Sequence, residues 1–181
     1  MARVISGSGA GYKLKVNSDK KLRPTTSRVK EALFDIIQFD IRNSIFLDLF
    51  SGSGQIGVEA ISRGAKKVIF VEQNRNYVKT IKENVEKILN NSKVELEIIN
   101  CDVVLFLKKL NYKADIIFLD PPFSSDLLEI TLPKITRIVS ENGFFIAEAP
   151  SERRLEKNIY DFTLLKKYKY GKISLNLYCK F

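Results

Sequence analysis

The stretch IIFLDPPFSSD combines the residue types best suited to chemistry in this chain. Two consecutive prolines cannot extend a central strand, and they form a rigid segment without backbone N–H donors. The carboxylate of Asp120 and a carbonyl of Pro121 or Pro122 could accept hydrogens from an exocyclic amine, and the ring of Phe123 could stack on a base. The stretch therefore predicts a site for a planar amine, with these four residues as the catalytic set.

A second candidate site is the glycine turn in LDLFSGSGQIGVEA, where Gly52, Gly54 and Gly57 form GxGxxG. The missing side chains let the backbone approach a ligand and let a helix pack on a strand. Glu72 ends the next apolar run, where it could accept hydrogen bonds from ribose hydroxyls. Asp48 precedes the turn, and its charge suits the cationic amino group of S-adenosylmethionine better than a pyrophosphate. The turn thus favours a nucleoside cofactor carrying a positive charge.

Two parts of this interpretation have alternatives. Asp102, after the third apolar run, offers a carboxylate or an adjacent N–H to an adenine edge, or it caps the following helix. The glycine pattern alone also fits NAD or FAD, so an oxidoreductase is an alternative from a different class. An oxidoreductase leaves the DPPF segment and the charge distribution unexplained.

The elements that must position these residues alternate along the chain. Helical spacing follows RPTT, with an apolar stripe from Val29 to Ile37 and Thr26 or Ser27 as candidate caps. Strands are expected at 44–49, 67–71, 94–99, 114–119 and 143–149, and helices at 55–63, 74–89, 102–110 and 126–139, the last kinked at Pro133. Nearly continuous apolar strands between helices predict an α/β fold with a doubly wound parallel sheet. Two further strands around Gly171 predict a C-terminal antiparallel hairpin.

Composition limits the classes of protein. The 181 residues suit one compact domain, no apolar stretch is long enough for a membrane span, and we expect a cytoplasmic protein. The chain has no histidine, which excludes histidine-based catalysis and the common zinc sites, so no metal is expected. The two cysteines have no motif spacing and are expected to be reduced.

The net charge of +9 is concentrated at the two ends of the chain. Residues 1–30 carry eight lysines and arginines against one acidic residue, and residues 151–181 carry eight against three, whereas the centre is acidic overall. Basic segments attract nucleic acid through phosphate contacts and counterion release. This distribution predicts a nucleic-acid partner.

Together, LDLFSGSG and LDPPF resemble the class I S-adenosylmethionine-dependent amino methyltransferases, whose (D/N)PP(Y/F/W) motif serves methylation of exocyclic amines of bases. With RVISGSGAGYKLKV, RPTTSRVKEALFDII and YGKISLNLY added, the chain is similar to the RsmD family. These bacterial enzymes methylate the N2 amine of guanine in small-subunit ribosomal RNA. The resemblance runs from Arg3 to Tyr178, with Tyr12 standing where the family commonly has arginine.

The resemblance implies a Rossmann-like methyltransferase sheet over residues 41–181 and, over residues 1–40, an N-terminal β-hairpin and helix extension that serves as a lid. Residues 23–26 would fold over the methionine end of the cofactor. The cofactor, S-adenosyl-L-methionine with S-adenosyl-L-homocysteine as product, would be bound by Arg23, Thr25, Asp48, Phe50, Gly52, Gly54, Glu72, Asp102, Val103 and Asp120. RNA would be contacted by Arg3, Tyr12, Lys13, Lys15, Lys20, Lys21 and Arg28.

The implied partner is ribosomal RNA, within a small-subunit particle, bound by a monomeric enzyme. Two alternatives remain open beside the oxidoreductase. A DPPF segment does not separate the amines of different bases, so methylation of adenine N6 in DNA is one. A non-catalytic RNA-binding assembly factor with the same fold is the other. The sequence leaves open which guanine is methylated, whether naked RNA or an assembled particle is the substrate, and the oligomeric state.

Overall fold

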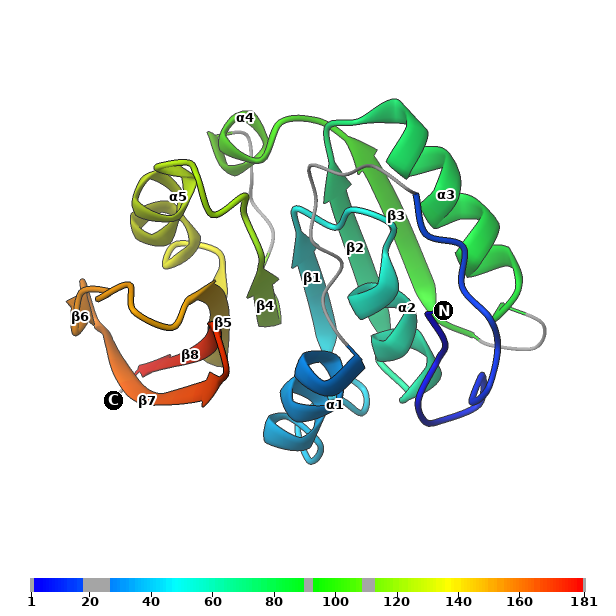
Figure 1. The fold of residues 1–181 in the computed structure, drawn as a ribbon, viewed down its shortest axis with the longest axis horizontal. Coiled ribbons are helices and arrows are strands. Elements are labelled where there is room, and N and C mark those ends of the chain that lie inside the picture. Colours follow the sequence, from blue (N-terminus) through cyan, green and yellow to red (C-terminus); the bar gives the residue numbers. More distant parts are fainter. Residues whose placement is uncertain (1, 18–26, 90–92, 109–112, 181) are drawn as a thin grey trace.

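The computed structural model describes residues 2–17, 27–89, 93–108 and 113–180. Its centre is an eight-stranded sheet with the strand order β3-β2-β1-β4-β5-β8-β7-β6 (Figure 1). The first five strands along the chain are mutually parallel: β1 (Ile45–Leu49), β2 (Lys67–Glu72), β3 (Glu95–Asn100), β4 (Ala114–Leu119) and β5 (Val139–Pro150). Three antiparallel strands complete the sheet: β6 (Asn158–Ile159), β7 (Phe162–Tyr170) and β8 (Ile173–Lys180). The predicted parallel sheet with a C-terminal antiparallel hairpin is confirmed.

Helices cover both faces of this sheet, as the apolar runs predicted. They are α1 (Ser27–Ile36), α2 (Gln55–Ser62), α3 (Arg75–Glu86), α4 (Val103–Lys108) and α5 (Leu127–Ile135). Successive side chains of β1 point to opposite faces of the sheet and belong to two different apolar clusters. Phe46 packs with side chains of α1, α2 and α3, whereas Leu47 packs with those of α4 and α5. No helix in the described ranges is long and apolar enough to cross a membrane.

The boundary between α5 and β5 differs from the prediction. Helix α5 continues past Pro133 and ends at Ile135, and β5 already begins at Val139. The register between β4 and β5 shifts between the pairs Ala114↔Val139 and Ile116↔Phe144, so β5 contains extra residues there. The polar residues of this irregular stretch do not alternate with apolar ones, which is why the sequence indicated a strand only from residue 143. The predicted ranges 55–63 and 74–89 agree better and contain α2 and α3; Gly64 follows α2 with φ 92°, and the side chain of Asn74 caps α3.

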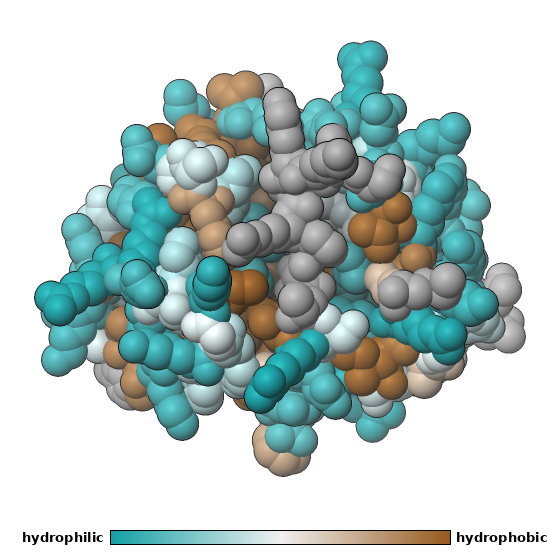
Figure 2. Space-filling model, viewed as in Figure 1, coloured by the Kyte–Doolittle hydropathy of each residue, from teal (hydrophilic) through white to brown (hydrophobic). Residues whose placement is uncertain are grey.

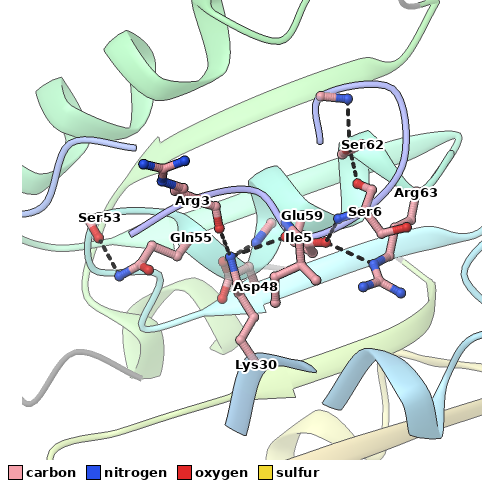
Figure 3. A network of polar contacts seen from close by, with 12 residues as sticks. Arg3, Ile5, Ser6, Lys30, Asp48, Ser53, Gln55, Glu59, Ser62 and Arg63 are labelled. Carbon is pink, nitrogen blue, oxygen red and sulfur yellow. Dashed lines mark hydrogen bonds and ion pairs between the residues drawn. The ribbon is translucent and has the colours of Figure 1, made fainter. Parts of the chain in front are cut away.

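The N-terminal segment forms a loop closed by one antiparallel bridge between Arg3 and Lys13. Glu59 of α2, with a fully buried side chain, holds this loop in place, as Figure 3 shows. Its carboxylate accepts hydrogen bonds from the N–H groups of Ile5 at 2.8 Å and Ser6 at 2.9 Å. It also forms ion pairs with Lys30 of α1 at 3.2 Å and Arg63 at 2.9 Å. One buried acid thus joins the N-terminal loop, α1 and α2.

Candidate cofactor and substrate site

A cavity of about 290 Å³ opens at the carboxyl edge of the parallel strands. It lies where the chain returns from β3 to pair β4 with β1, the position where doubly wound sheets bind ligands. Eight residues predicted from the sequence line it: Asp48, Phe50, Gly52, Glu72, Asp102, Val103, Asp120 and Pro122. The fold thus brings the glycine turn and the DPPF segment to a single cavity.

The three glycines of the turn have different roles. Gly52 has φ 53° and lines the cavity, and a Cβ added to it would meet no atom within 4 Å. A Cβ on Gly57 would lie 2.2 Å from a ring carbon of Phe70 in β2. Gly54 has φ 76° and stands directly before α2. The first glycine therefore opens the backbone to the cavity, and the third lets α2 pack against the sheet.

Two buried acids hold the turn from inside. The Asp48 carboxylate is 1% exposed and accepts a hydrogen bond from the N–H of Gly57 at 3.0 Å. Burial raises the pKa of Asp48 to about 8, against the lowering effect of that bond, and the negative charges of Asp120 and Glu72 raise it further. The Glu72 carboxylate accepts from the N–H groups of Gly52 at 2.9 Å and Asn74 at 2.8 Å, and burial raises its pKa.

The third predicted acid, Asp102, caps a helix and also lines the cavity. Its Oδ1 accepts a hydrogen bond from the N–H of Leu105 at 3.0 Å, so it caps α4. It also lines the cavity together with buried Val103. Four carboxyl groups, those of Asp48, Glu72, Asp102 and Asp120, therefore surround one cavity, while the described lining residues include no lysine or arginine.

The DPPF segment follows β4 directly. Pro122 and Asp120 line the cavity, Pro121 is buried, and Phe123 is half-buried beside them. Ser125 donates to the Pro122 carbonyl from its N–H at 3.1 Å and from its Oγ at 2.6 Å. The Pro121 carbonyl makes no hydrogen bond within the part of the chain that the structure describes, so it is the available acceptor beside Asp120. No group of three metal-binding side chains occurs among the described residues.

The predicted RNA-contacting residues lie apart from the cavity lining. Four of them are exposed on the N-terminal loop and at the start of α1: Arg3, Tyr12, Lys13 and Arg28. Lys15 is exposed as well and forms an ion pair of 2.7 Å with Glu83. Arg23, Thr25, Lys20 and Lys21 fall outside the described residues.

The contacts through which the N-terminal segment reaches the cavity were not predicted from the sequence. Asn84, fully buried in α3, donates from Nδ2 to the carbonyls of Lys15 and Ser53, both at 2.9 Å, and accepts from the N–H of Lys15 at 2.8 Å. The hydroxyl of Thr80 donates to Asn17 at 2.6 Å, and Asn17 lines the cavity. A polar residue within the buried stripe of α3 was the available signal for Asn84.

The sheet order and the ligand cavity at its switch point define the chain as a Rossmann-like α/β protein. Residues 2–179 match the family model described as Conserved hypothetical protein 95. "Ribosomal RNA small subunit methyltransferase D" of Haemophilus influenzae is 38% identical over 97% of this chain and 92% of its own length. The protein of the same name from Escherichia coli is 35% identical over 81% of this chain and 71% of its own length. The solved structure of yhhF from Escherichia coli, 29% identical, matches 98% of this chain and 97% of that one with a TM-score of 0.86.

The chain belongs to this family, which is the RsmD family that its motifs indicated. The resemblance inferred from the motifs is confirmed over nearly the whole chain.

Proposed function

We propose that the protein is an S-adenosylmethionine-dependent methyltransferase that modifies the exocyclic N2 amine of a guanine in small-subunit ribosomal RNA. The observation that carries this proposal is the position of Asp120, which lines the same cavity as the glycine turn. An amine held by Asp120 would therefore lie beside a ligand held by the turn. The names of relatives that match nearly the full chain support ribosomal RNA as the substrate.

The residues of the cavity fit S-adenosylmethionine better than a dinucleotide. A carboxylate stabilises a nearby cation and opposes a pyrophosphate, and the described lining carries four carboxyl groups and no basic side chain. Asp48 would lie beside the charged amino group, and this nearby cation would favour the ionised form of Asp48 and lower the pKa that burial raises. Glu72 and Asp102 would accept from ribose hydroxyls and the adenine edge. The open space at Gly52 admits the ligand close to the backbone.

When bound, S-adenosylmethionine supplies a methyl group activated by its sulfonium charge. The guanine amine is a poor nucleophile because its lone pair is delocalised into the ring. In this mechanism the Asp120 carboxylate and the Pro121 carbonyl accept hydrogen bonds from the two N–H groups of the N2 amine. These bonds orient the nitrogen and favour the pyramidal geometry of the transition state. Phe123 stacks on the base after it leaves its helix. The nitrogen becomes acidic only after methylation, and Asp120 then holds the released proton.

The N-terminal extension would carry the RNA. Its exposed basic residues lie on a loop anchored through Glu59 and Asn84, so RNA bound there is held in a fixed relation to the cavity. Figure 2 shows hydrophilic residues over most of one face of the molecule, with hydrophobic ones in separate small patches. We propose that one copy of the chain acts on ribosomal RNA within a small-subunit particle.

Asp120→Ala tests the catalytic role. We expect loss of methyl transfer to RNA with an affinity for S-adenosylhomocysteine within a few fold of wild type, measured by calorimetry. Asp126→Ala is the matched control, because Asp126 is exposed in the same loop and its side chain makes no capping hydrogen bond to α5. If the main defect of Asp120→Ala is loss of cofactor binding, the assigned role is wrong.

Two further measurements separate the alternatives. Mass spectrometry of methylated nucleosides distinguishes guanine N2 from adenine N6 as the product. Thermal stabilisation by S-adenosylhomocysteine and not by NAD distinguishes a methyltransferase from an oxidoreductase.

A further inference from the structure

Glu148, near the carboxyl end of β5, is a buried acid that the sequence analysis did not select. Its side chain is 3% exposed, and its Oε2 has no hydrogen-bond partner within the described part of the chain. Burying a carboxyl oxygen without a partner is costly, and buried polar atoms in proteins are nearly always paired. Such an atom near a ligand site points to a ligand that supplies the missing donor.

The strand register places Glu148 next to Asp120. β4 and β5 pair through Phe118↔Ile146 and Leu119↔Ala147, so Glu148 stands opposite Asp120 at the following position. Phe118 and Ile146 belong to the same apolar cluster, so by alternation Asp120 and Glu148 share that face of the sheet. Burial raises the pKa of Glu148 to about 9, and the negative charge of Asp120 adds to the effect. Burial and the neighbouring charge of Asp120 thus both favour the neutral, protonated form of the Glu148 carboxyl.

The sheet order separates the cofactor side from the Glu148 side. The cavity is bounded by residues that follow β1, β2 and β3, and Asp120 is at its β4 border. Glu148 lies beyond that border on β5. The negative charge of Asp120 raises the pKa of both Asp48 and Glu148, so Asp120 lies close enough to interact with both carboxyl groups. A base whose amine is held by Asp120 would extend its ring toward β5, away from the cofactor.

We infer that Glu148 determines the base specificity of this site by hydrogen bonding to N1–H and O6 of the target guanine. This inference rests on the function proposed above. A neutral carboxyl group presents one acceptor and one donor side by side. Guanine has a donor at N1 and an acceptor at O6 next to its N2 amine, so it forms both hydrogen bonds. In adenine and cytosine the ring nitrogen beside the amine is an acceptor, and at most one of the two bonds forms.

The test compares two RNA oligonucleotides that differ at one position, one with guanine and one with 2-aminopurine. 2-Aminopurine keeps the N2 amine but lacks both N1–H and O6. For the wild-type protein we expect kcat/KM for guanine to exceed that for 2-aminopurine by about 30-fold or more, because a site built for hydrogen bonds rejects an analogue that lacks them. For Glu148→Met we expect this ratio to fall below about 3-fold. Glu148→Gln should keep the ratio within a few fold of wild type, since an amide also offers one donor face and one acceptor face.

Stability and binding measurements separate recognition of the base from a structural role. Glu148→Met removes an unpaired buried oxygen, so its Tm should equal or exceed that of wild type, and its affinity for S-adenosylhomocysteine should be unchanged. The control is Glu141→Met, at an exposed glutamate of the same strand, which should leave the ratio unchanged.

An unchanged ratio in folded Glu148→Met, with both substrates slowed in parallel, overturns the inference and leaves the proposed function intact. A wild-type ratio below about 3-fold overturns it without any variant. A wild-type protein that methylates no guanine N2 refutes the proposed function, and the inference falls with it.

Discussion

Replacing Gly57 with alanine tests the claim that this glycine makes room for the sheet and not for a ligand. The added Cβ would lie 2.2, 2.6 and 2.9 Å from three ring carbons of Phe70, where ordinary contacts begin at 3.4 Å. Phe70 is fully buried in β2, so α2 or the ring must move by about 1 Å within a packed core. Such overpacking costs about 3 kcal/mol, and alanine recovers about 1 kcal/mol through helix propensity. We expect a net loss of about 2 kcal/mol, which lowers the Tm by about 4–8 °C.

A double-mutant cycle measured by urea unfolding tests whether the added Cβ at position 57 clashes with the ring of Phe70. Phe70→Leu alone should cost about 1–2 kcal/mol through the cavity it leaves. In the Gly57→Ala background it should cost little or nothing, because it removes the ring atoms that the new Cβ meets. A coupling energy of at least about 1 kcal/mol is expected. Gly57→Ala with wild-type stability, or costs that simply add, would refute the reasoning.

Gly52→Ala is the contrasting substitution. The new Cβ meets no protein atom, so only the left-handed φ of 53° is penalised, by about 1–2 kcal/mol, and Phe70→Leu should not relieve this cost. Because Gly52 lines the cavity, we expect the affinity for S-adenosylhomocysteine to fall about tenfold or more by calorimetry. Unchanged affinity would show that the open space at Gly52 does not receive the cofactor.

The remaining predictions concern pH, the buried ion pairs and RNA affinity. Asp48 has a folded pKa of about 8 against an ordinary value of 3.8, so the native state retains a proton that the unfolded state releases. The stability that this group contributes therefore falls as pH rises from about 4 to about 8. In Asp48→Asn the free energy of unfolding, measured by urea denaturation, should fall less steeply over this pH range, by up to about 1.4 kcal/mol per pH unit. Glu59→Leu should lower the free energy of unfolding by about 3–5 kcal/mol because it leaves Lys30 buried without its acid, and Lys30→Met should restore much of this loss. Lys13→Gln and Lys15→Gln should each reduce the slope of log affinity for RNA against log salt concentration by about one. An unchanged slope in filter binding would show that these residues do not contact RNA phosphates.

The elements that the sequence predicted correctly are those whose pattern is local. β1 and β4 are buried on both faces, and their nearly continuous apolar residues identify them without knowledge of their neighbours. The glycine after α2 fixes that helix end through its own φ. The start of β5 was missed because a register shift against β4 sets it, and no pattern within residues 139–143 records that pairing.

By itself the sequence determined that a glycine turn and a DPPF segment each follow a strand, because both depend only on adjacent residues. It also determined that these strands are parallel, so that both motifs reach one edge. Only the tertiary structure decided that Glu148 stands beside Asp120, that Asn84 holds the N-terminal segment, and that Lys30 is a buried partner of Glu59. Each of these contacts joins residues distant in the chain, so strand order, register and helix packing select the partners, and local residue types do not.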